Sequence, residues 1–227
     1  GETRTNLKVI DPVNHTNTDI NEPGVTVSEE ILNGLLAQLT AGLEKGDIVV
    51  LSGSLPKGSP RDTYYTWTGA CKKAGAKVIL DADGELLEAG LKASPYLIKP
   101  NNHELSQLLG ETLATPEELN KAARRLMEEH GIAKVVVSMG GKGALYVTQD
   151  ETIYAEGLKV PVGSTVGAGD SVVAALAVAE ESGMGLEETV RLSTATGGAN
   201  VMCSGTQAAE YEVIQELLPK VVFQKIQ

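Results

Sequence analysis

The chain has 227 residues, of which 42% are hydrophobic and 22% charged, a composition typical of folded proteins with one or two α/β domains. The net charge of −11 disfavours binding to nucleic acids and anionic membranes, and the aromatic content of 4% disfavours stacking on bases. No apolar run reaches transmembrane length, and the two cysteines form no CxxC pair. We therefore expect a cytoplasmic protein.

The first segment, residues 1–27, predicts a small antiparallel sheet that would form a lid. Residues 3–10 alternate between polar and apolar side chains, as a half-exposed strand does. A polar turn and a second short strand then end at Pro23-Gly24. The chain begins with Gly rather than Met, so we expect a fragment that lacks its start. A removed tag or initiator Met is the alternative.

The second segment, residues 28–227, predicts an α/β core. Ser28 is followed by two acids and an amphipathic pattern, which indicates a capped helix that ends near Gly46. Continuous apolar runs, typical of strands buried on both faces, follow at 47–53, 77–81, 96–99 and 134–138. Helical patterns lie between them at 61–74, 84–92, 102–109 and 115–130. This alternation predicts a doubly wound parallel sheet with helices on both faces.

The last third of the chain predicts two further strands and three helices. Residues 143–148 and 152–156 are expected to form an antiparallel edge of the sheet. Helices are expected at 168–182, 186–203 and 209–218. Polar and glycine clusters follow three of the core strands, at 52–54, 99–101 and 138–141. Ligands of open α/β sheets bind at the carboxyl ends of the strands, so these clusters predict a site there.

The segment Gly163–Ser171 carries the strongest chemical signal. Its small residues allow close backbone approach, and free N–H groups at the following helix start would bind an anion such as a transferring phosphoryl group. Asp170 in that turn suits a base that accepts a hydroxyl proton; an ordinary helix-start acid is the alternative. The segment Gly140–Gly143 lacks the spacing of a P-loop, and no GxGxxG follows a first strand, so any nucleotide is held differently.

Four segments in chain order resemble the ribokinase-like sugar kinases of the phosphofructokinase B family. The segment 165–171 is similar to the family's C-terminal signature, and 99–105 to its N-x-x-E motif. The segment 135–144 resembles its nucleotide-binding strand and loop, and 52–56 its substrate loop. The resemblance implies a three-layer α/β/α fold with a mainly parallel sheet and a small β lid.

The resemblance also implies roles for individual residues, which concern catalysis, the nucleotide, the metal and the sugar. Asp170 would be the catalytic base, with Gly167, Ala168 and Gly169 as the anion hole. ATP would contact Lys99, Asn101, Ser138, Gly140 and Gly143, with Asn200 beside the adenine. Asn101 and Glu104, the latter through water, would organise Mg²⁺; the same spacing of three is that of a helix capping box. Arg4, Asn6, Gly53 and Ser54 would bind the sugar phosphate, although a solvent-facing arginine is the alternative for Arg4.

The function implied is ATP-dependent phosphorylation of a hexose phosphate, with fructose 1-phosphate converted to fructose 1,6-bisphosphate. Tagatose 6-phosphate is the alternative substrate, and a non-catalytic sugar-phosphate-binding relative or a dinucleotide-dependent oxidoreductase are the alternative classes. The resemblance further implies a homodimer formed through the lid and leaves activation by a monovalent cation open. Family members begin with a strand carrying a substrate-binding Asp and a Gly-Gly-x-x-x-N-x-A segment. Neither is found here, which supports the expectation of a missing start.

Overall fold

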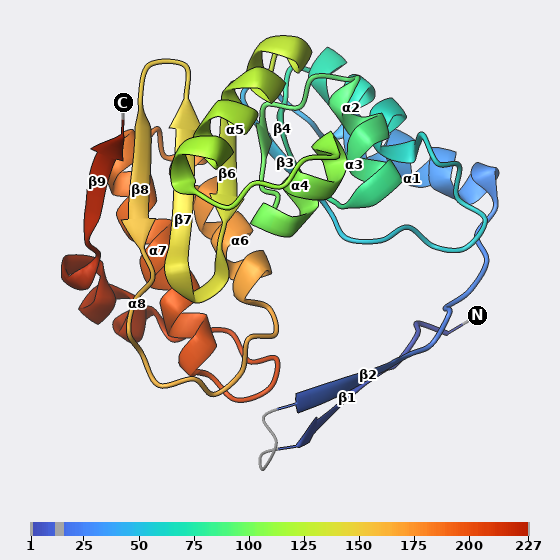
Figure 1. Ribbon diagram of the computed structural model, residues 1–227. Coiled ribbons are helices and arrows are strands. Elements are labelled where there is room, and N and C mark those ends of the chain that lie inside the picture. Colours follow the sequence, from blue (N-terminus) through green and yellow to red (C-terminus); the bar gives the residue numbers. More distant parts are fainter. Residues whose placement is uncertain (1, 12–15, 227) are drawn as a thin grey trace.

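Two sheets organise the chain in the computed structural model, which describes residues 2–11 and 16–226 (Figure 1). The smaller sheet is an antiparallel hairpin of β1 (Asn6–Asp11) and β2 (Thr16–Asn21). The larger sheet contains, in spatial order, β3 (Ile48–Ser52), β4 (Lys77–Asp81), β5 (Leu97–Ile98), β6 (Lys134–Ser138), β7 (Gly143–Thr148), β8 (Thr152–Glu156) and β9 (Phe223–Ile226). Within the described ranges, no helix is long and apolar enough to cross a membrane.

The larger sheet is parallel on one side and antiparallel on the other. Strands β3 to β6 pair in parallel, and β4 shows why, since Val78, Ile79 and Leu80 are fully buried between two helical layers. Strands β6 to β9 pair antiparallel. The predicted position of β7 and β8 as the sheet edge is wrong, because β9 pairs beyond β8. The strand β9 was missed because it has only four residues, two of them polar and exposed.

Helices cover both faces of the larger sheet and complete three layers. The helices are α1 (Glu29–Ala41), α2 (Thr63–Lys73), α3 (Gly84–Leu91), α4 (Asn102–Leu109), α5 (Pro116–His130), α6 (Ala168–Glu181), α7 (Leu186–Met202) and α8 (Tyr211–Leu217). Side chains of α2 to α5 share one core cluster with the sheet, and those of α6 to α8 share the other. The predicted three-layer α/β/α fold is confirmed.

Local capping signals fix where several helices begin. Asn101 and Thr115 each form a capping box with the glutamate three residues later, at the starts of α4 and α5. In contrast, the N-cap residue of α6 is Gly167, which has a φ of +80° and provides no side-chain cap. The first N–H groups of α6 therefore lack side-chain partners, unlike those of α4 and α5.

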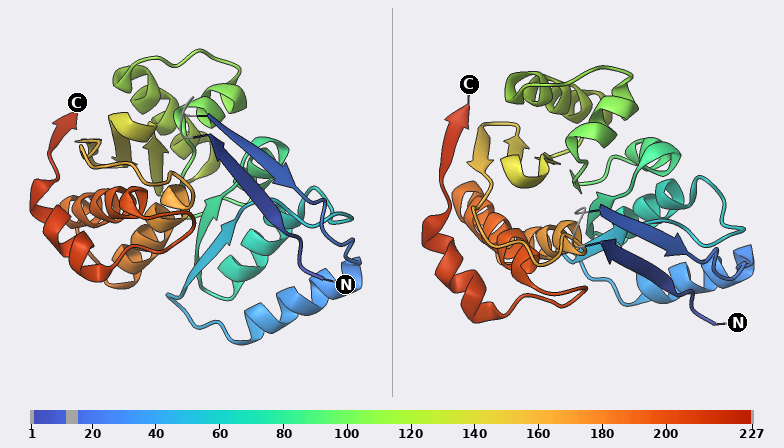
Figure 2. Two further views of the ribbon diagram at one scale, coloured as in Figure 1. Left: turned by 90° about the horizontal axis from the view of Figure 1, so that it is seen from below. Right: turned by 60° about the horizontal axis from the view of Figure 1, so that its bottom comes forward.

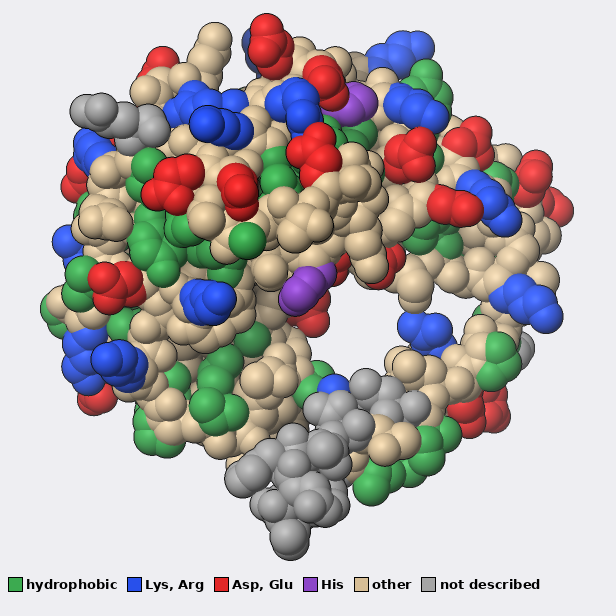
Figure 3. All heavy atoms as spheres, viewed as in Figure 1, with side chains coloured by type: hydrophobic (Ala, Val, Ile, Leu, Met, Phe, Trp, Pro, Cys, Tyr) green, Lys and Arg blue, Asp and Glu red, His purple; other side chains and the backbone are tan. Residues whose placement is uncertain are grey.

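The hairpin extends from the core and lies across the carboxyl-terminal edge of the parallel strands (Figure 2). A space-filling view shows an opening between the hairpin and the α/β core (Figure 3). Three apolar side chains of the hairpin, Leu7, Val9 and Ile20, are 50–56% exposed. They share one face of the hairpin, because Leu7 pairs with Ile20 in the antiparallel register.

Candidate active site

An ion pair lies at the carboxyl ends of β4 and β5. The Lys99 ammonium lies 3.1 Å from a carboxylate oxygen of Asp81, and both side chains are largely buried. The other Asp81 carboxylate oxygen accepts a hydrogen bond of 3.2 Å from the Ser52 hydroxyl. Strands β3, β4 and β5 thus place their terminal polar residues together, as the parallel topology predicts. Burial, and secondly the nearby Asp81 charge, raise the pKa of the Tyr64 phenol, which donates to the carbonyls of Ser52 and Gly53.

The uncapped start of α6 lies beside this ion pair. A Cβ placed on Gly169 would be 3.5 Å from the Lys99 ammonium, so the cation and the first turn of α6 are neighbours. Behind the turn, Asn200 is 4% exposed and its Oδ1 has no hydrogen-bond partner among the described residues. That atom lies 3.7 Å from the Cβ position of Gly167. A cation and free helix-start amides together can hold an anion.

Asp170 is exposed in the first turn of α6, directly after Ala168 and Gly169. It is therefore neither buried nor remote from the strand tips, the two placements that would exclude a role as a base. Its role as a base stays a prediction.

A cavity of about 430 Å³ opens between the strand tips, the start of α6 and α7. Its size lies in the range of small-molecule sites. Six of the residues predicted from sequence line it, namely Lys99, Ser138, Gly140, Gly143, Ala168 and Gly169. The remaining wall is largely apolar, with Ala144, Leu158, Val160, Val162, Val172 and Val201. An apolar slot that ends at a cation and a helix start is suited to a nucleotide, with the base in the slot and the phosphates at the helix.

The Asn101–Glu104 motif forms the capping box that its spacing predicted. The Asn101 side-chain oxygen accepts hydrogen bonds from the N–H groups of His103 and Glu104. In return, Glu104 accepts from the main-chain N–H of Asn101 at 2.8 Å and from its side-chain amide at 2.5 Å. The predicted capping box is thus confirmed, and the role of both residues toward Mg²⁺ stays a prediction.

The predicted sugar-phosphate residues are brought together only in part. The Arg4 guanidinium donates a hydrogen bond of 3.1 Å to the Ser54 hydroxyl, 50 residues away in sequence. Gly53 follows β3 with a φ of +84°, which turns the chain toward Ser54. Asn6 lies on β1 opposite Asn21 and is exposed. Arg4 therefore reaches the α/β core, whereas Asn6 lies further along the hairpin.

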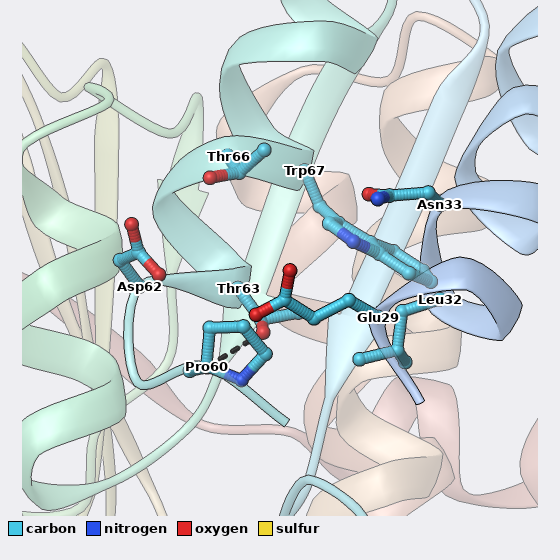
Figure 4. A pocket seen from close by; sticks show the side chains of 8 residues that line it. All are labelled: Glu29, Leu32, Asn33, Pro60, Asp62, Thr63, Thr66 and Trp67. Atoms are coloured by element: carbon cyan, nitrogen blue, oxygen red, sulfur yellow. Dashed lines mark hydrogen bonds between the residues drawn. The ribbon is translucent and has the colours of Figure 1, made fainter. Parts of the chain in front are cut away.

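A second hollow, of about 270 Å³, lies between α1 and α2 and contains none of the predicted site residues (Figure 4). The ring of Trp67 and the side chain of Leu32 form one wall, and Pro60 lies opposite. Two acids at its rim, Glu29 and Asp62, are exposed. The residues that line this hollow are all different from those that line the cavity at the start of α6.

Several site residues escaped the sequence analysis. Asp81 ends the predicted strand 77–81 but belongs to no motif, and its contact with Lys99 depends on the pairing of β4 with β5. Tyr146 and Thr194 line the cavity and hydrogen-bond each other at 3.1 Å, but they come from β7 and α7, 48 residues apart. Their proximity follows only from the packing of α7 under the sheet. Among the histidines, His15, for which no role was expected, lies outside the described residues.

Comparison with known proteins identifies the class that this fold and site define. Residues 1–212 match the family model of the pfkB family carbohydrate kinases, and the chain belongs to that family. It is thus a member of a family of sugar-directed phosphotransferases, and the resemblance predicted from the motifs is confirmed.

The chain is also similar to individual proteins of known sequence or structure. The 1-phosphofructokinase of Bacillus subtilis (strain 168) is 38% identical over 221 residues, which cover 97% of this chain and 71% of that protein. The 1-phosphofructokinase of Rhodobacter capsulatus is 43% identical over 196 residues, which cover 86% of this chain and 62% of that protein. Among solved structures, phosphofructokinase-2 from Escherichia coli in complex with potassium superimposes with a TM-score of 0.89 at 34% identity. The superposition covers 96% of this chain and 71% of the phosphofructokinase-2 chain. The chain thus spans about two thirds of the length of these relatives.

Proposed function

We propose that the complete protein transfers the γ-phosphoryl group of ATP to fructose 1-phosphate and releases ADP and fructose 1,6-bisphosphate. The observation that carries the proposal is the order of groups along the strand tips. Ser54 follows β3 and accepts a hydrogen bond from Arg4. Lys99 follows β5 and lies beside the start of α6. The apolar cavity begins at the end of β6. A sugar phosphate and a nucleotide bound at the two ends would meet at Asp170.

We also place the reaction in the cytoplasm, where ATP is abundant and free cysteines such as Cys71 and Cys203 persist.

In this proposal the chain's own residues supply a base and a fixed positive field. The Asp170 carboxylate accepts the proton of the sugar hydroxyl as that oxygen attacks the γ-phosphorus, and the bond to the ADP oxygen breaks on the opposite side. The free N–H groups at the α6 start and the Lys99 ammonium stabilise the charge on the transferring group. Both are held in place before substrates bind, so little reorganisation is needed during the reaction.

The residues present fit a Mg²⁺ ion held mainly by phosphates and water. Among the described residues, no group of three or more His, Cys, Asp or Glu side chains could enclose a metal. Mg²⁺ commonly keeps several waters and takes few protein ligands. Glu104, through water, and Asn101 would hold it on the nucleotide side, where it neutralises phosphate charge when bound. The capping box fixes the orientation of both side chains.

The choice of sugar rests on relatives and is the first point to test. The relatives from Bacillus subtilis and Rhodobacter capsulatus are 1-phosphofructokinases, whereas phosphofructokinase-2 from Escherichia coli has been solved in complex with fructose-6-phosphate. ADP release by the full-length protein is to be measured with fructose 1-phosphate, fructose 6-phosphate and tagatose 6-phosphate, each with and without potassium. Preference for either of the other two sugars would refute the proposal that fructose 1-phosphate is the substrate. Sugar-phosphate binding without ADP release would leave the non-catalytic alternative.

Replacing Arg4 with alanine is expected to weaken sugar-phosphate binding. A guanidinium–phosphate hydrogen bond contributes about 1.5–3 kcal/mol, so KM for fructose 1-phosphate should rise about 10- to 150-fold with kcat changed far less. Arg61→Ala is the matched control, because Arg61 is exposed and pairs with Glu85, and neither residue lines the cavity. An unchanged KM in Arg4→Ala would favour the alternative of a solvent-facing arginine.

We further propose that the exposed face of the hairpin pairs with a second copy of the chain in a homodimer. Isolated two-stranded sheets are only marginally stable, and a hairpin with exposed Leu7, Val9 and Ile20 needs a covering surface. One solved structure of phosphofructokinase-2 from Escherichia coli is a tetrameric inhibited form, so higher assembly is an outcome to watch for.

Ile20→Lys in the full-length protein is expected to convert the dimer to monomer, because a charge would replace an apolar contact at the centre of that face. The measurement is sedimentation equilibrium over a range of concentrations. Ile31→Lys is the control, since Ile31 is 60% exposed on α1, outside the hairpin. A protein that sediments as a dimer after both substitutions would place the interface elsewhere.

A further inference from the structure

A buried ionic cluster lies at the end of the sheet opposite the candidate site. Its centre is Glu180, one residue before the end of α6, whose side chain is only 5% exposed. The Lys134 ammonium donates a hydrogen bond to one carboxylate oxygen, and the Lys77 ammonium lies 3.6 Å from the other. Tyr96 also lies beside Glu180; burial, and secondly the interaction with Glu180, raise the pKa of the Tyr96 phenol.

The cluster is not explained by the local stability of α6. A carboxylate in the last turn of a helix lies at the negative end of the helix dipole, which disfavours it. The last turn of α6 contains no basic residue that would offset the charge. Burial of the carboxylate is costly as well, unless it is paired. The compensating positive charges come from other elements, namely Lys77 of β4 and Lys134 of β6. Both ammonium groups also lie over the Tyr96 ring, at 4.7 and 5.7 Å from its centre.

Each member of the cluster shares an element or strand with a member of the candidate site. Lys77 begins β4, and Asp81 ends it. Lys134 begins β6, and Ser138 ends it. Glu180 lies in the last turn of α6, and the anion-binding turn lies in its first, so ten residues and about 15 Å of helix separate Glu180 from Asp170.

The same relation holds for the remaining member. Tyr96 precedes β5, and Lys99 follows it. Three adjacent strands and α6 are therefore fastened to one another at the cluster and present their other ends to the substrates.

We propose that Glu180 is a positioning residue, which fixes α6 along and around its axis relative to β4, β5 and β6. This sets the distance between the α6 amides and Lys99. The inference rests on the proposed kinase function. A shift of one end of a helix is transmitted along its length, and misplacement of reacting groups by about 1 Å can cost on the order of 100-fold in rate. The contacts predicted for the sugar phosphate, Arg4 and Ser54, lie outside α6 and should be unaffected.

The test compares Glu180→Gln with a matched control in the full-length protein. Glutamine keeps the length and shape of the side chain and removes the charge that two lysines share. Lys225→Gln is the control, because Lys225 is a lysine between two carboxylates, Glu151 and Glu187, on the surface. We expect kcat per folded molecule to fall about 5- to 100-fold in Glu180→Gln, with KM for the sugar phosphate within about twofold of the parent. The control should keep both values.

A second variant and a second readout cover poor folding and failure of the kinase proposal. Lys77→Met removes only the more distant cation, whose side chain is 40% exposed, and should give a smaller loss of kcat in the same direction. Hydrogen exchange of Ser171 and of the amides that follow it in α6, which are hydrogen-bonded within the helix, should accelerate in Glu180→Gln and not in the control. Unchanged kcat per folded molecule in both cluster variants would overturn the inference. If the parent phosphorylates no sugar, the proposed function fails, and exchange alone decides whether Glu180 positions the start of α6.

Discussion

Asp170→Asn in the full-length protein is expected to lower kcat on the order of 10²–10⁴-fold or more, with ATP affinity little changed. Asparagine has nearly the same shape as aspartate but cannot accept the hydroxyl proton. The uncapped amides of α6 and the Lys99 ammonium remain in place, and both belong to the nucleotide side of the site. The exposed position of Asp170 means that the substitution removes no buried interaction, so stability should hold.

The measurements that check this are single-turnover phosphorylation of fructose 1-phosphate and nucleotide binding by calorimetry. Asp150→Asn is the matched control, because Asp150 is an exposed aspartate between β7 and β8, distant in sequence from the proposed catalytic turn. If Asp170→Asn retains the parental kcat, Asp170 is an ordinary helix-start acid, and the base must be sought elsewhere. If ATP binding is lost as well, the carboxylate has a structural role at the start of α6.

Local signals allowed much of the fold to be predicted from sequence. The fully buried β4 gave a continuous apolar run, and the capping boxes at Asn101 and Thr115 marked the starts of α4 and α5. The strand β9 was missed because β-pairing with β8 depends on residues 68 or more positions apart, and FQKI has no strong pattern of its own. Such long-range pairing leaves little trace in local sequence.

The candidate site was predictable where its residues belong to contiguous motifs. Gly167 to Asp170 and the Asn101–Glu104 box are local, and their spacing carries their geometry. The partner of Lys99 was not predictable, because Asp81 meets it only through the parallel pairing of β4 with β5. The Glu180 cluster was hidden for the same reason. In the sequence its members are three ordinary charged residues and a tyrosine at the ends of strands and of a helix.

Gly143 has a structural requirement for glycine that the motif resemblance did not predict. The motif resemblance predicted a contact with ATP, and Gly143 does line the cavity. The structure gives a separate need for glycine, since φ is +113° and an added Cβ would lie 1.9 Å from the carbonyl oxygen of Ala155. The Cβ would also lie 2.7 Å from the amide nitrogen of Gly157. These neighbours are main-chain atoms of β8 and the following loop, so they cannot move aside as a flexible side chain would.

Gly143→Ala is therefore expected to lower the free energy of unfolding by about 3 kcal/mol or more, through backbone strain and overpacking together. For a domain of this size that corresponds to a fall in Tm of about 6–12 °C, measured by urea and thermal unfolding followed by circular dichroism. Gly141→Ala is the matched control, because a Cβ there meets nothing within 4 Å and φ lies outside the left-handed region. It should change stability by about 1 kcal/mol or less.

The two glycine variants also separate the roles of the loop between β6 and β7. Relief of the clash requires the start of β7 to move away from β8, and this would displace the turn Gly140–Lys142 that borders the cavity. Gly143→Ala should thus lose ATP affinity along with stability. Equal stability of the two variants would show that β7 and β8 tolerate a side chain at this point. In that case the glycine at position 143 would be required only by the nucleotide, as the motif alone suggests.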